Sequence, residues 1–403
     1  MNRRDFLATT AAGFASTVVA STLPGRAFAA EPIKLGILAP VTDFTGVDVL
    51  RAVELAVEQV NAAGGIMGRK VELSIGDEEN TPEKAIQAFQ NLALRNKVVA
   101  IIGGFRSGSV LALQPYVSRF KVPFLITGGA SPDIMKPVAE KYDQFKYMFR
   151  PWINANVQAE LLAMACRDVL KPAGFTRLAI DAENFKWAHD YSDVLKTILP
   201  KDGFQIVLNT SHDPTTTDFT PVFRDAVNAK AQGLLMIISN QAGYTFVKQW
   251  RDQKVPLQVM GNNNASYLVS AFWKDTQGAC EYEVSTVCKA ALTDRTIPFW
   301  DTFEKKFGAA PFVTALGSYD SVFMLKQAME ESKSTKADDI VKVLEGIQYK
   351  GTLGNLKFTK SHELEHGPGK VFLPYGQWQG GQKIALWPTS IALGHYKRPP
   401  WMT

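Results

Sequence analysis

The side chains best placed for chemistry follow an apolar stretch near residue 100, Val98–Ile102. This stretch is rich in β-branched residues and predicts a strand buried on both faces, which two glycines then end. Arg106, Ser107 and Ser109 come next, where a helical pattern begins. Because the first N–H groups of a helix are free and its dipole is positive there, this turn is a candidate anion site. The alternative is that both serines serve only as helix caps.

Similar turns are expected beside this one, because strand and helix patterns alternate along the first 150 residues. This alternation, with short glycine-containing turns, predicts βαβ units and a parallel sheet. Ligands of such sheets bind beyond the carboxyl ends of the strands, where the turns 43–46, 106–109 and 129–131 lie. The expected strands are Ile33–Ala39, Val71–Ile75, Val98–Ile102 and Pro123–Ile126, and the expected helices are Val49–Ala62, Pro82–Arg95 and Leu111–Phe120.

The alternation restarts near Arg150, which predicts an α/β protein of two lobes with a cleft between them. In the second unit, Glu183–Trp187 forms one strand-end turn and residues 262–264 form another. From Thr352 onward the pattern favours strands and hairpins, with a glycine pair at 380–381. The strands expected in the second unit are Arg177–Asp181, Phe204–Asn209, Gly233–Ile238 and Gln258–Met260.

Residues 1–30 have the pattern of an export signal. Arg3 and Arg4 form a twin-arginine pair, a weakly apolar region follows, and Ala27-Phe28-Ala29 is a small-x-small cleavage site. A membrane anchor is the alternative, but the apolar region is shorter than the ~20 residues that a spanning helix needs. We therefore expect cleavage after Ala29 or Ala30 and a periplasmic location.

Composition excludes several other classes of protein. The net charge is +5, and the Lys and Arg residues are scattered, which argues against nucleic-acid and membrane partners. The three cysteines do not make a disulfide framework, although Cys280 and Cys288 can pair if the chain turns between them. We expect no cofactor and no metal.

A rival hypothesis, a zinc hydrolase, comes from His362–His366, whose sequence HELEH matches HExxH. This motif binds zinc only on a helix, where the two histidines share one face. A Gly-Pro-Gly sequence follows at once, so we expect a solvated loop. A serine hydrolase is also disfavoured, because the chain has no GxSxG motif. The protein is therefore expected not to be an enzyme.

Seven ordered segments across residues 33–393 resemble the Leu/Ile/Val-binding proteins, the substrate-binding proteins of ABC transporters for branched-chain amino acids. They are IKLGILAPVTDFTG, AVELAVEQVNAAGGIMGRKVEL, VVAIIGGFRSGSV, VPFLITGGASPD, TTDFTPVF, SYDSVFMLKQAME and the hairpin around Gln377-Trp378. The resemblance implies the type I periplasmic-binding fold, with two doubly wound parallel-sheet lobes joined by three crossovers and a ligand in the inter-lobe cleft. The implied crossovers lie near Arg150–Asn156, Gln277–Cys288 and Gly351–Phe358. One lobe would hold residues 31–152 and about 281–353, and the other 153–280 and about 354–403.

The same resemblance implies an extracytoplasmic solute-binding protein of an ABC importer. It would act as a monomer, close on a small solute and deliver it to a permease and ATPase complex at the inner membrane. A ligand-sensing subunit for a receptor kinase is the alternative that keeps the fold.

The family's ligand positions fall in the predicted strand-end turns. Ser107 matches the hydroxyl that holds a ligand α-carboxylate, and Gly129, Ala130 and Ser131 match the next turn. The other matched positions are Phe44 in the first turn, Phe185 or Trp187 from the second lobe, Gln241 where an aromatic is frequent, and Asn263.

Asn263 is a departure from the family pattern, which places there the carboxylate that holds a ligand ammonium. An amide is neutral and pairs poorly with a desolvated ammonium. Arg106 beside Ser107 favours an anion instead. We therefore expect a ligand that carries a carboxylate and need not carry an ammonium. Asp43 and Glu183 remain candidates for the missing negative charge, so an amino acid stays open.

Overall fold

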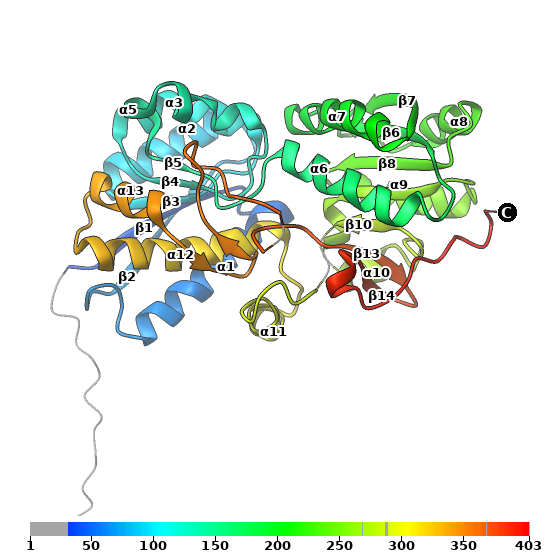
Figure 1. The fold of residues 1–403 in the computed structure, drawn as a ribbon. Coiled ribbons are helices and arrows are strands. Elements are labelled where there is room, and N and C mark those ends of the chain that lie inside the picture. Colours follow the sequence, from blue (N-terminus) through cyan, green and yellow to red (C-terminus); the bar gives the residue numbers. More distant parts are fainter. Residues whose placement is uncertain (1–30, 268, 287–288, 368, 403) are drawn as a thin grey trace, which may run out of the picture.

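The computed structural model describes residues 31–267, 269–286, 289–367 and 369–402, which form two α/β lobes lying side by side (Figure 1). The expected export signal, residues 1–30, lies outside the described residues. So does Cys288 of the candidate cysteine pair.

The first lobe is built on a five-stranded parallel sheet with the strand order β2-β1-β3-β4-β5. Its central strand is the buried apolar stretch that precedes the candidate anion site, and all four of its residues are buried. The strands are β1 (Ile33–Ala39), β2 (Val71–Asp77), β3 (Ala100–Gly103), β4 (Phe124–Ile126) and β5 (Met148–Phe149).

Helices from two distant parts of the chain pack around this sheet: α1 lies against α12, and α2 lies against α3 (Figure 1). A short β11–β12 hairpin follows the last of these helices. The helices are α1 (Phe44–Ala62), α2 (Pro82–Gln90), α3 (Ser107–Phe120), α4 (Lys136–Glu140), α5 (Tyr142–Phe145), α11 (Thr296–Phe307), α12 (Val313–Ser332) and α13 (Ala337–Gly346), and the hairpin strands are β11 (Tyr349–Lys350) and β12 (Asn355–Leu356).

The second lobe is built on a seven-stranded sheet with the order β14-β13-β10-β9-β8-β6-β7. It is parallel except for β13 and β14, which form the expected C-terminal hairpin. The two doubly wound lobes predicted from the sequence are therefore confirmed. The strands are β6 (Arg177–Glu183), β7 (Gln205–His212), β8 (Gly233–Ile238), β9 (Gln258–Asn263), β10 (Val284–Thr286), β13 (Tyr375–Gln379) and β14 (Gln382–Trp387). The helices are α6 (Ala155–Ala165), α7 (Lys186–Ile198), α8 (Thr220–Asn228), α9 (Ala242–Asp252) and α10 (Val269–Asp275).

Two contacts lie near the later implied crossovers. β10 pairs with β9, so the second sheet extends to Thr286, which lies within the implied crossover Gln277–Cys288. Glu363 forms a backbone bridge with Arg150, which directly follows β5, so the chain still contacts the first lobe after Phe358. A three-residue strand and a single-residue bridge are too short to show a hydrophobic period in the sequence.

Several elements extend closer to the cleft than the sequence patterns indicated. α1 begins at Phe44, because the Asp43 side chain accepts a hydrogen bond from the N–H of Thr45 at 2.8 Å and caps the helix. α3 begins at Ser107, and β9 continues to Asn263. The cleft is therefore edged by the ends of regular elements, which hold side chains more firmly than loops do.

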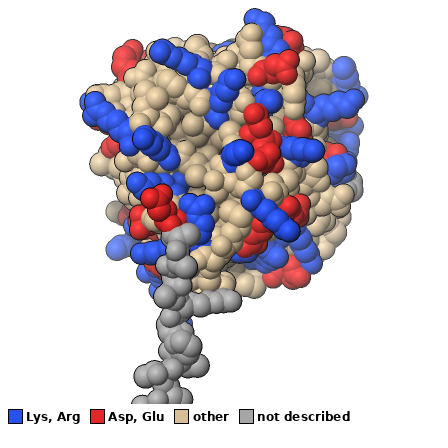
Figure 2. Space-filling view, turned by 90° about the vertical axis from the view of Figure 1, so that its left-hand side faces the viewer, with Lys and Arg blue, Asp and Glu red and all other residues tan. Residues whose placement is uncertain are grey.

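The outer face of the first lobe carries Lys and Arg side chains spread among Asp and Glu side chains (Figure 2). This mixed distribution agrees with the scattered basic residues of the sequence. Among the described residues, no helix is both long enough and apolar enough to cross a membrane.

Candidate ligand-binding site

Residues that follow strands of both sheets line one cavity of about 350 Å³ between the lobes. This volume suits a small organic molecule. The first lobe contributes Asn80, Phe105, Arg106, Ser107, Ser109 and Ala130, among others. The second lobe contributes Phe185, Lys186, Trp187, Ser239, Asn262 and Tyr267, and Trp152 comes from the first crossover.

Ser107 and Ser109 stand at the start of α3 in the cavity wall, and no side chain caps this helix. The Ser107 hydroxyl oxygen accepts hydrogen bonds from the backbone N–H groups of Ala130 and Ser131, at 3.2 and 3.1 Å. The Ser109 hydroxyl is buried and has no hydrogen-bond partner among the described residues. The cap-only alternative is therefore wrong, and Ser109 and the first N–H groups of α3 are available to a ligand.

Arg106 reaches from the first lobe to the second across the cavity. Its Nη1 donates a hydrogen bond to Ser239 Oγ at 3.1 Å. Its guanidinium lies 4.5 Å from the ring centroid of Phe185 and 5.1 Å from that of Phe105. Cation–π contacts with two rings hold the guanidinium in the wall while leaving it charged.

The charged side chains in the lining are those of two cations, Arg106 and Lys186. No carboxylate lines the cavity in the described part of the chain. Lys186 is ion-paired with Asp133 and Asp190, whereas Arg106 has no ion-pair partner among the described residues. Arg106 is therefore the cation of the lining that favours an anionic ligand.

Glu183, one candidate for the charge that would hold an ammonium, lies behind the second-lobe wall. Its carboxylate accepts hydrogen bonds from Trp187 Nε1 at 2.7 Å, from the N–H of Ser239 at 3.0 Å and from Asn240 Nδ2 at 2.9 Å. Burial raises the pKa of Glu183, and the Ser239 and Trp187 donors oppose that shift. Its oxygens are therefore occupied by protein donors.

Glu78 is a second buried carboxyl group near the cavity. Its Oε1 accepts a hydrogen bond from the N–H of Phe105 at 2.8 Å, and its Oε2 has no partner among the described residues. Burial raises the pKa of Glu78 to about 8. Burial therefore favours the neutral form of this carboxyl group, and the Arg106 charge opposes that shift.

Asn263, expected to face the ligand, points away from the cavity. Side chains alternate along a strand, and β9 continues through this residue, so Asn262 and Asn264 line the cavity instead. Asn263 Nδ2 donates to Glu283 Oε1 at 2.8 Å inside the second lobe. The expectation is therefore corrected by one residue. Asn262 is also an amide, so the cavity-facing position still lacks an acid.

Three other predicted residues lie outside the lining. Asp43 caps α1, and Phe44 packs edge-on against Phe312 with ring centroids 5.5 Å apart. Gln241 is exposed and directly precedes α9. Asp43 is therefore not placed to hold a ligand ammonium in this cavity.

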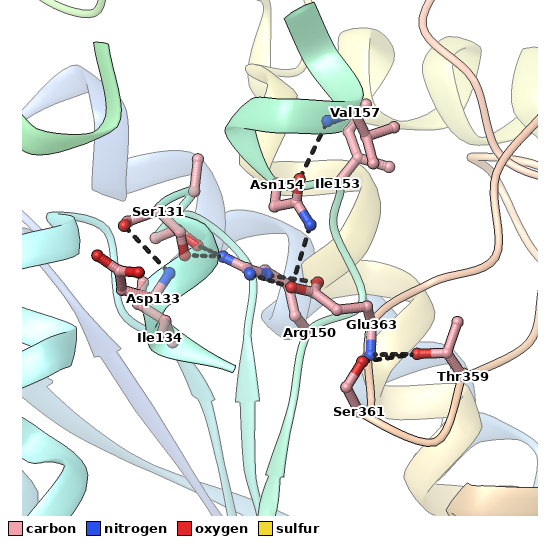
Figure 3. A network of polar contacts seen from close by, with 12 residues as sticks. Ser131, Asp133, Ile134, Arg150, Ile153, Asn154, Val157, Thr359, Ser361 and Glu363 are labelled. Carbon is pink, nitrogen blue, oxygen red and sulfur yellow. Dashed lines mark hydrogen bonds and ion pairs between the residues drawn. The ribbon is translucent and has the colours of Figure 1, made fainter. Parts of the chain in front are cut away.

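Gly129 and Ser131 also lie outside the lining, but they support the turn that contains Ala130. The carbonyl oxygens of Gly129 and Ser131 accept hydrogen bonds from Arg150 Nη1 at 2.7 and 2.8 Å (Figure 3). The Ser131 hydroxyl donates to Asp190 Oδ2 of α7 at 2.7 Å, which joins the two lobes. Of the predicted site residues, the structure thus brings Arg106, Ser107, Ala130, Phe185 and Trp187 together in the cavity wall.

Several lining residues were not predicted from the sequence. Lys186 is one of them, although it stands between the two predicted aromatic residues. Asn80 follows β2, a strand-end turn that was not considered and could have been found by the same rule. Trp152 and Tyr267 come from a crossover and a short helical turn, for which the sequence carried no signal.

The HELEH stretch forms no helix, and its histidines contact different lobes. His362 Nδ1 lies 2.8 Å from the carbonyl oxygen of Met148 in β5, whereas His366 Nε2 lies 3.3 Å from Glu160 Oε2 on α6. These two rings cannot share one ion as they would on an HExxH helix. No group of His, Cys, Asp and Glu among the described residues could hold a metal. The zinc-hydrolase hypothesis is therefore wrong.

A family profile described as "Periplasmic binding protein" matches residues 32–372. Leu/Ile/Val-binding protein homolog 7 of Brucella melitensis is 25% identical over 405 aligned positions, which cover 94% of this chain and 98% of that protein. A solute-binding protein of an ABC transporter from R. palustris, solved in complex with benzoate, superposes with a TM-score of 0.76 at 15% identity, covering 88% of this chain and 95% of that one. The substrate-binding protein LivJ from Streptococcus pneumoniae, solved in complex with isoleucine, gives a TM-score of 0.75 at 16% identity, with 88% and 100% covered.

Proposed function

The chain belongs to the periplasmic binding protein family, and on this premise we propose that it captures a small organic carboxylate with an aromatic or branched apolar body. One observation carries the proposal: the cavity between the lobes is lined by two cations and, among the described residues, by no acid. An anion gains from the Arg106 guanidinium, which no carboxylate among the described residues pairs, whereas a ligand ammonium would be buried without a negative partner in the lining.

The first-lobe wall offers the groups that a carboxylate needs. Arg106 supplies a guanidinium. The start of α3 lies in the same wall and contributes its free N–H groups and the positive end of its dipole. The Ser109 hydroxyl adds a donor that no protein acceptor uses among the described residues. These donors together favour a carboxylate over a neutral amide.

The rest of the cavity suits an apolar body. Trp152, Phe185, Trp187 and Tyr267 line it, and each presents a large aromatic surface at small conformational cost. Benzoate and isoleucine, the ligands of the two solved proteins compared above, share a carboxylate, and isoleucine alone carries an ammonium. With no acid in the lining, we favour the benzoate type of ligand for this chain.

The role in transport follows from the family, whose members are exported to the periplasm. We propose that residues 1–30 direct this export and that the closed, loaded protein delivers its solute to an ABC permease as a monomer. In this proposal both lobes contact the permease, because closure fixes the position of one lobe relative to the other.

A thermal-shift comparison tests the proposed ligand class. We expect benzoate, 3-phenylpropionate or the keto acid of leucine to raise the unfolding temperature in proportion to its occupancy. Benzamide, which keeps the ring and loses the charge, serves as the matched control and is expected to give no shift. Equal stabilisation by benzamide and benzoate would contradict an anion site.

A further inference from the structure

Glu363, the first glutamate of the HELEH stretch, forms an ion pair with Arg150, which directly follows β5 (Figure 3). The Arg150 side chain is 0% exposed and that of Glu363 is 15% exposed. Arg150 Nε donates to Glu363 Oε2 at 2.8 Å, and Nη2 donates to Oε1. A guanidinium that meets a carboxylate through two parallel hydrogen bonds has a fixed orientation.

The same guanidinium holds the turn after β4. Its Nη1 donates to the carbonyl oxygens of Gly129 and Ser131, while the carbonyl oxygen of Ala130 between them accepts from the N–H of Ala155 at 2.7 Å. The N–H groups of Ala130 and Ser131 in turn bond the Ser107 hydroxyl at the cavity. The three carbonyl oxygens of Gly129–Ser131 and the N–H groups of Ala130 and Ser131 are therefore all hydrogen-bonded, and Arg150 bonds two of the carbonyl oxygens.

Glu363 links this turn to the second lobe as well. Its Oε1 accepts a hydrogen bond from Asn154 Nδ2 at 3.1 Å. Asn154 Oδ1 caps α6, the first helix of the second lobe, through the N–H of Val157 at 3.0 Å. One carboxylate thus connects the cavity turn, through Arg150, with the helix that leads into the other lobe.

We propose that Glu363 and Arg150 are a positioning pair, which holds the Gly129–Ser131 turn and the start of α6 in the arrangement that binds ligand. Neither residue lines the cavity, so the pair acts on the ligand only through the turn and the Ser107 hydroxyl. Without the carboxylate, Arg150 keeps a buried charge with no ionic partner and the turn loses its fixed donor. The effect on ligand rests on the proposed function, whereas the effect on the turn does not.

Amide hydrogen exchange in the ligand-free protein tests the pair directly. In Glu363→Gln, the N–H groups of Ala130 and Ser131 are expected to exchange roughly tenfold faster than in the wild type. Glu365→Gln is the matched control, because its carboxylate lies in the same stretch but pairs with Lys357 and Lys370. Equal exchange at Ala130 and Ser131 in the two variants would overturn the proposal.

Asn154→Ser provides a second variant in case Glu363→Gln does not fold. Serine caps a helix as well as asparagine does, so α6 is expected to keep its protection at Val157. Serine is too short to reach Glu363, so faster exchange at Ala130 and Ser131 is still expected. Wild-type exchange at both amides in this variant would overturn the proposal that the pair holds the turn and the start of α6 in one arrangement.

Ligand titration of the same variants separates this proposal from the proposed function. If benzoate or 3-phenylpropionate binds the wild type, we expect roughly tenfold weaker binding in Glu363→Gln and no change in Glu365→Gln. If neither carboxylate binds the wild type, the proposed function fails, while the exchange result still decides the positioning role. Loosened amides with unchanged affinity would refute the claim that the pair prepares the site for ligand.

Discussion

Replacing Ser109 by alanine is expected to weaken ligand binding without weakening the fold. The Ser109 hydroxyl is buried in the cavity wall and has no hydrogen-bond partner among the described residues. Its removal therefore breaks no bond within the described protein and relieves part of the penalty for an unsatisfied buried group, which is about 1–3 kcal/mol. The free energy of unfolding of the ligand-free variant is expected to equal or exceed that of the wild type.

The ligand-bound protein should respond in the opposite sense. A hydrogen bond to a charged partner contributes about 1.5–3 kcal/mol, so losing one to a ligand carboxylate weakens binding roughly ten- to 150-fold. Calorimetric titration with the carboxylate that gives the largest thermal shift measures the affinity, and urea unfolding measures the stability. The two results together report whether the hydroxyl serves the ligand or the fold.

Ser107→Ala is the matched control for this variant. The Ser107 hydroxyl accepts from two buried backbone N–H groups, so alanine leaves both without their acceptor and is expected to destabilise the ligand-free protein by about 1–3 kcal/mol. If Ser109→Ala loses as much stability as Ser107→Ala, or if it binds the carboxylate as tightly as the wild type, the assignment of Ser109 to the ligand is refuted.

Three further predictions follow from the charges around the cavity. Asp133→Asn removes an ion pair of 2.8 Å to Lys186 across the lobes. Because both side chains are about 40% exposed, we expect the contact between the lobes to lose only about 0–1 kcal/mol, in a salt-dependent way. X-ray scattering at low salt should show a larger radius of gyration of the ligand-free protein. Asn262→Asp is expected to weaken carboxylate binding by repulsion in calorimetry, whereas Asn263→Asp, which faces another carboxyl group inside the lobe, is expected to lower the unfolding temperature instead. Because the pKa of Glu78 is raised to about 8, the folded state holds the Glu78 proton more tightly than the unfolded state does. The free energy of unfolding is therefore expected to fall as pH rises from about 4.5 to 8, by up to about 1.4 kcal/mol per pH unit. Urea unfolding of Glu78→Gln at both ends of this range should show a smaller decrease.

The order of strands and helices could be predicted from the sequence, because buried parallel strands are apolar runs and the helices between them show a clear period. β1 and β8 have the predicted bounds, Ile33–Ala39 and Gly233–Ile238. Boundaries were less accurate where polar residues lie inside an element. Asn262 and Asn263 have the composition of a turn, yet β9 continues through them, and each amide nitrogen donates a hydrogen bond within the lobe.

The site was predicted only in part, because some of its residues lie in turns with a local sequence pattern and others do not. A strand-end turn with a helix start, as at Ser107, has a local signature, and the structure places that turn in the cavity wall. Asn263 was expected in the cavity because it matches a ligand position of the family. The direction in which a strand side chain points depends on register, and β9 continues through this residue, so Asn262 faces the cavity instead. Lining residues such as Tyr267 are brought to the cavity by tertiary packing and have no local pattern to find.

The most direct test of the central claim is a calorimetric titration with 3-phenylpropionate and phenylalanine, which share a carboxylate and a ring and differ by the ammonium. With Arg106 and Lys186 in the lining and no acid among the described lining residues, we expect 3-phenylpropionate to bind at least tenfold more tightly than phenylalanine. Tenfold corresponds to about 1.4 kcal/mol, the expected cost of burying the ammonium without a negative partner. Selective binding of phenylalanine, with 3-phenylpropionate failing to bind, would contradict a carboxylate site without ammonium recognition and would show that an acid such as Glu183 turns toward the ligand.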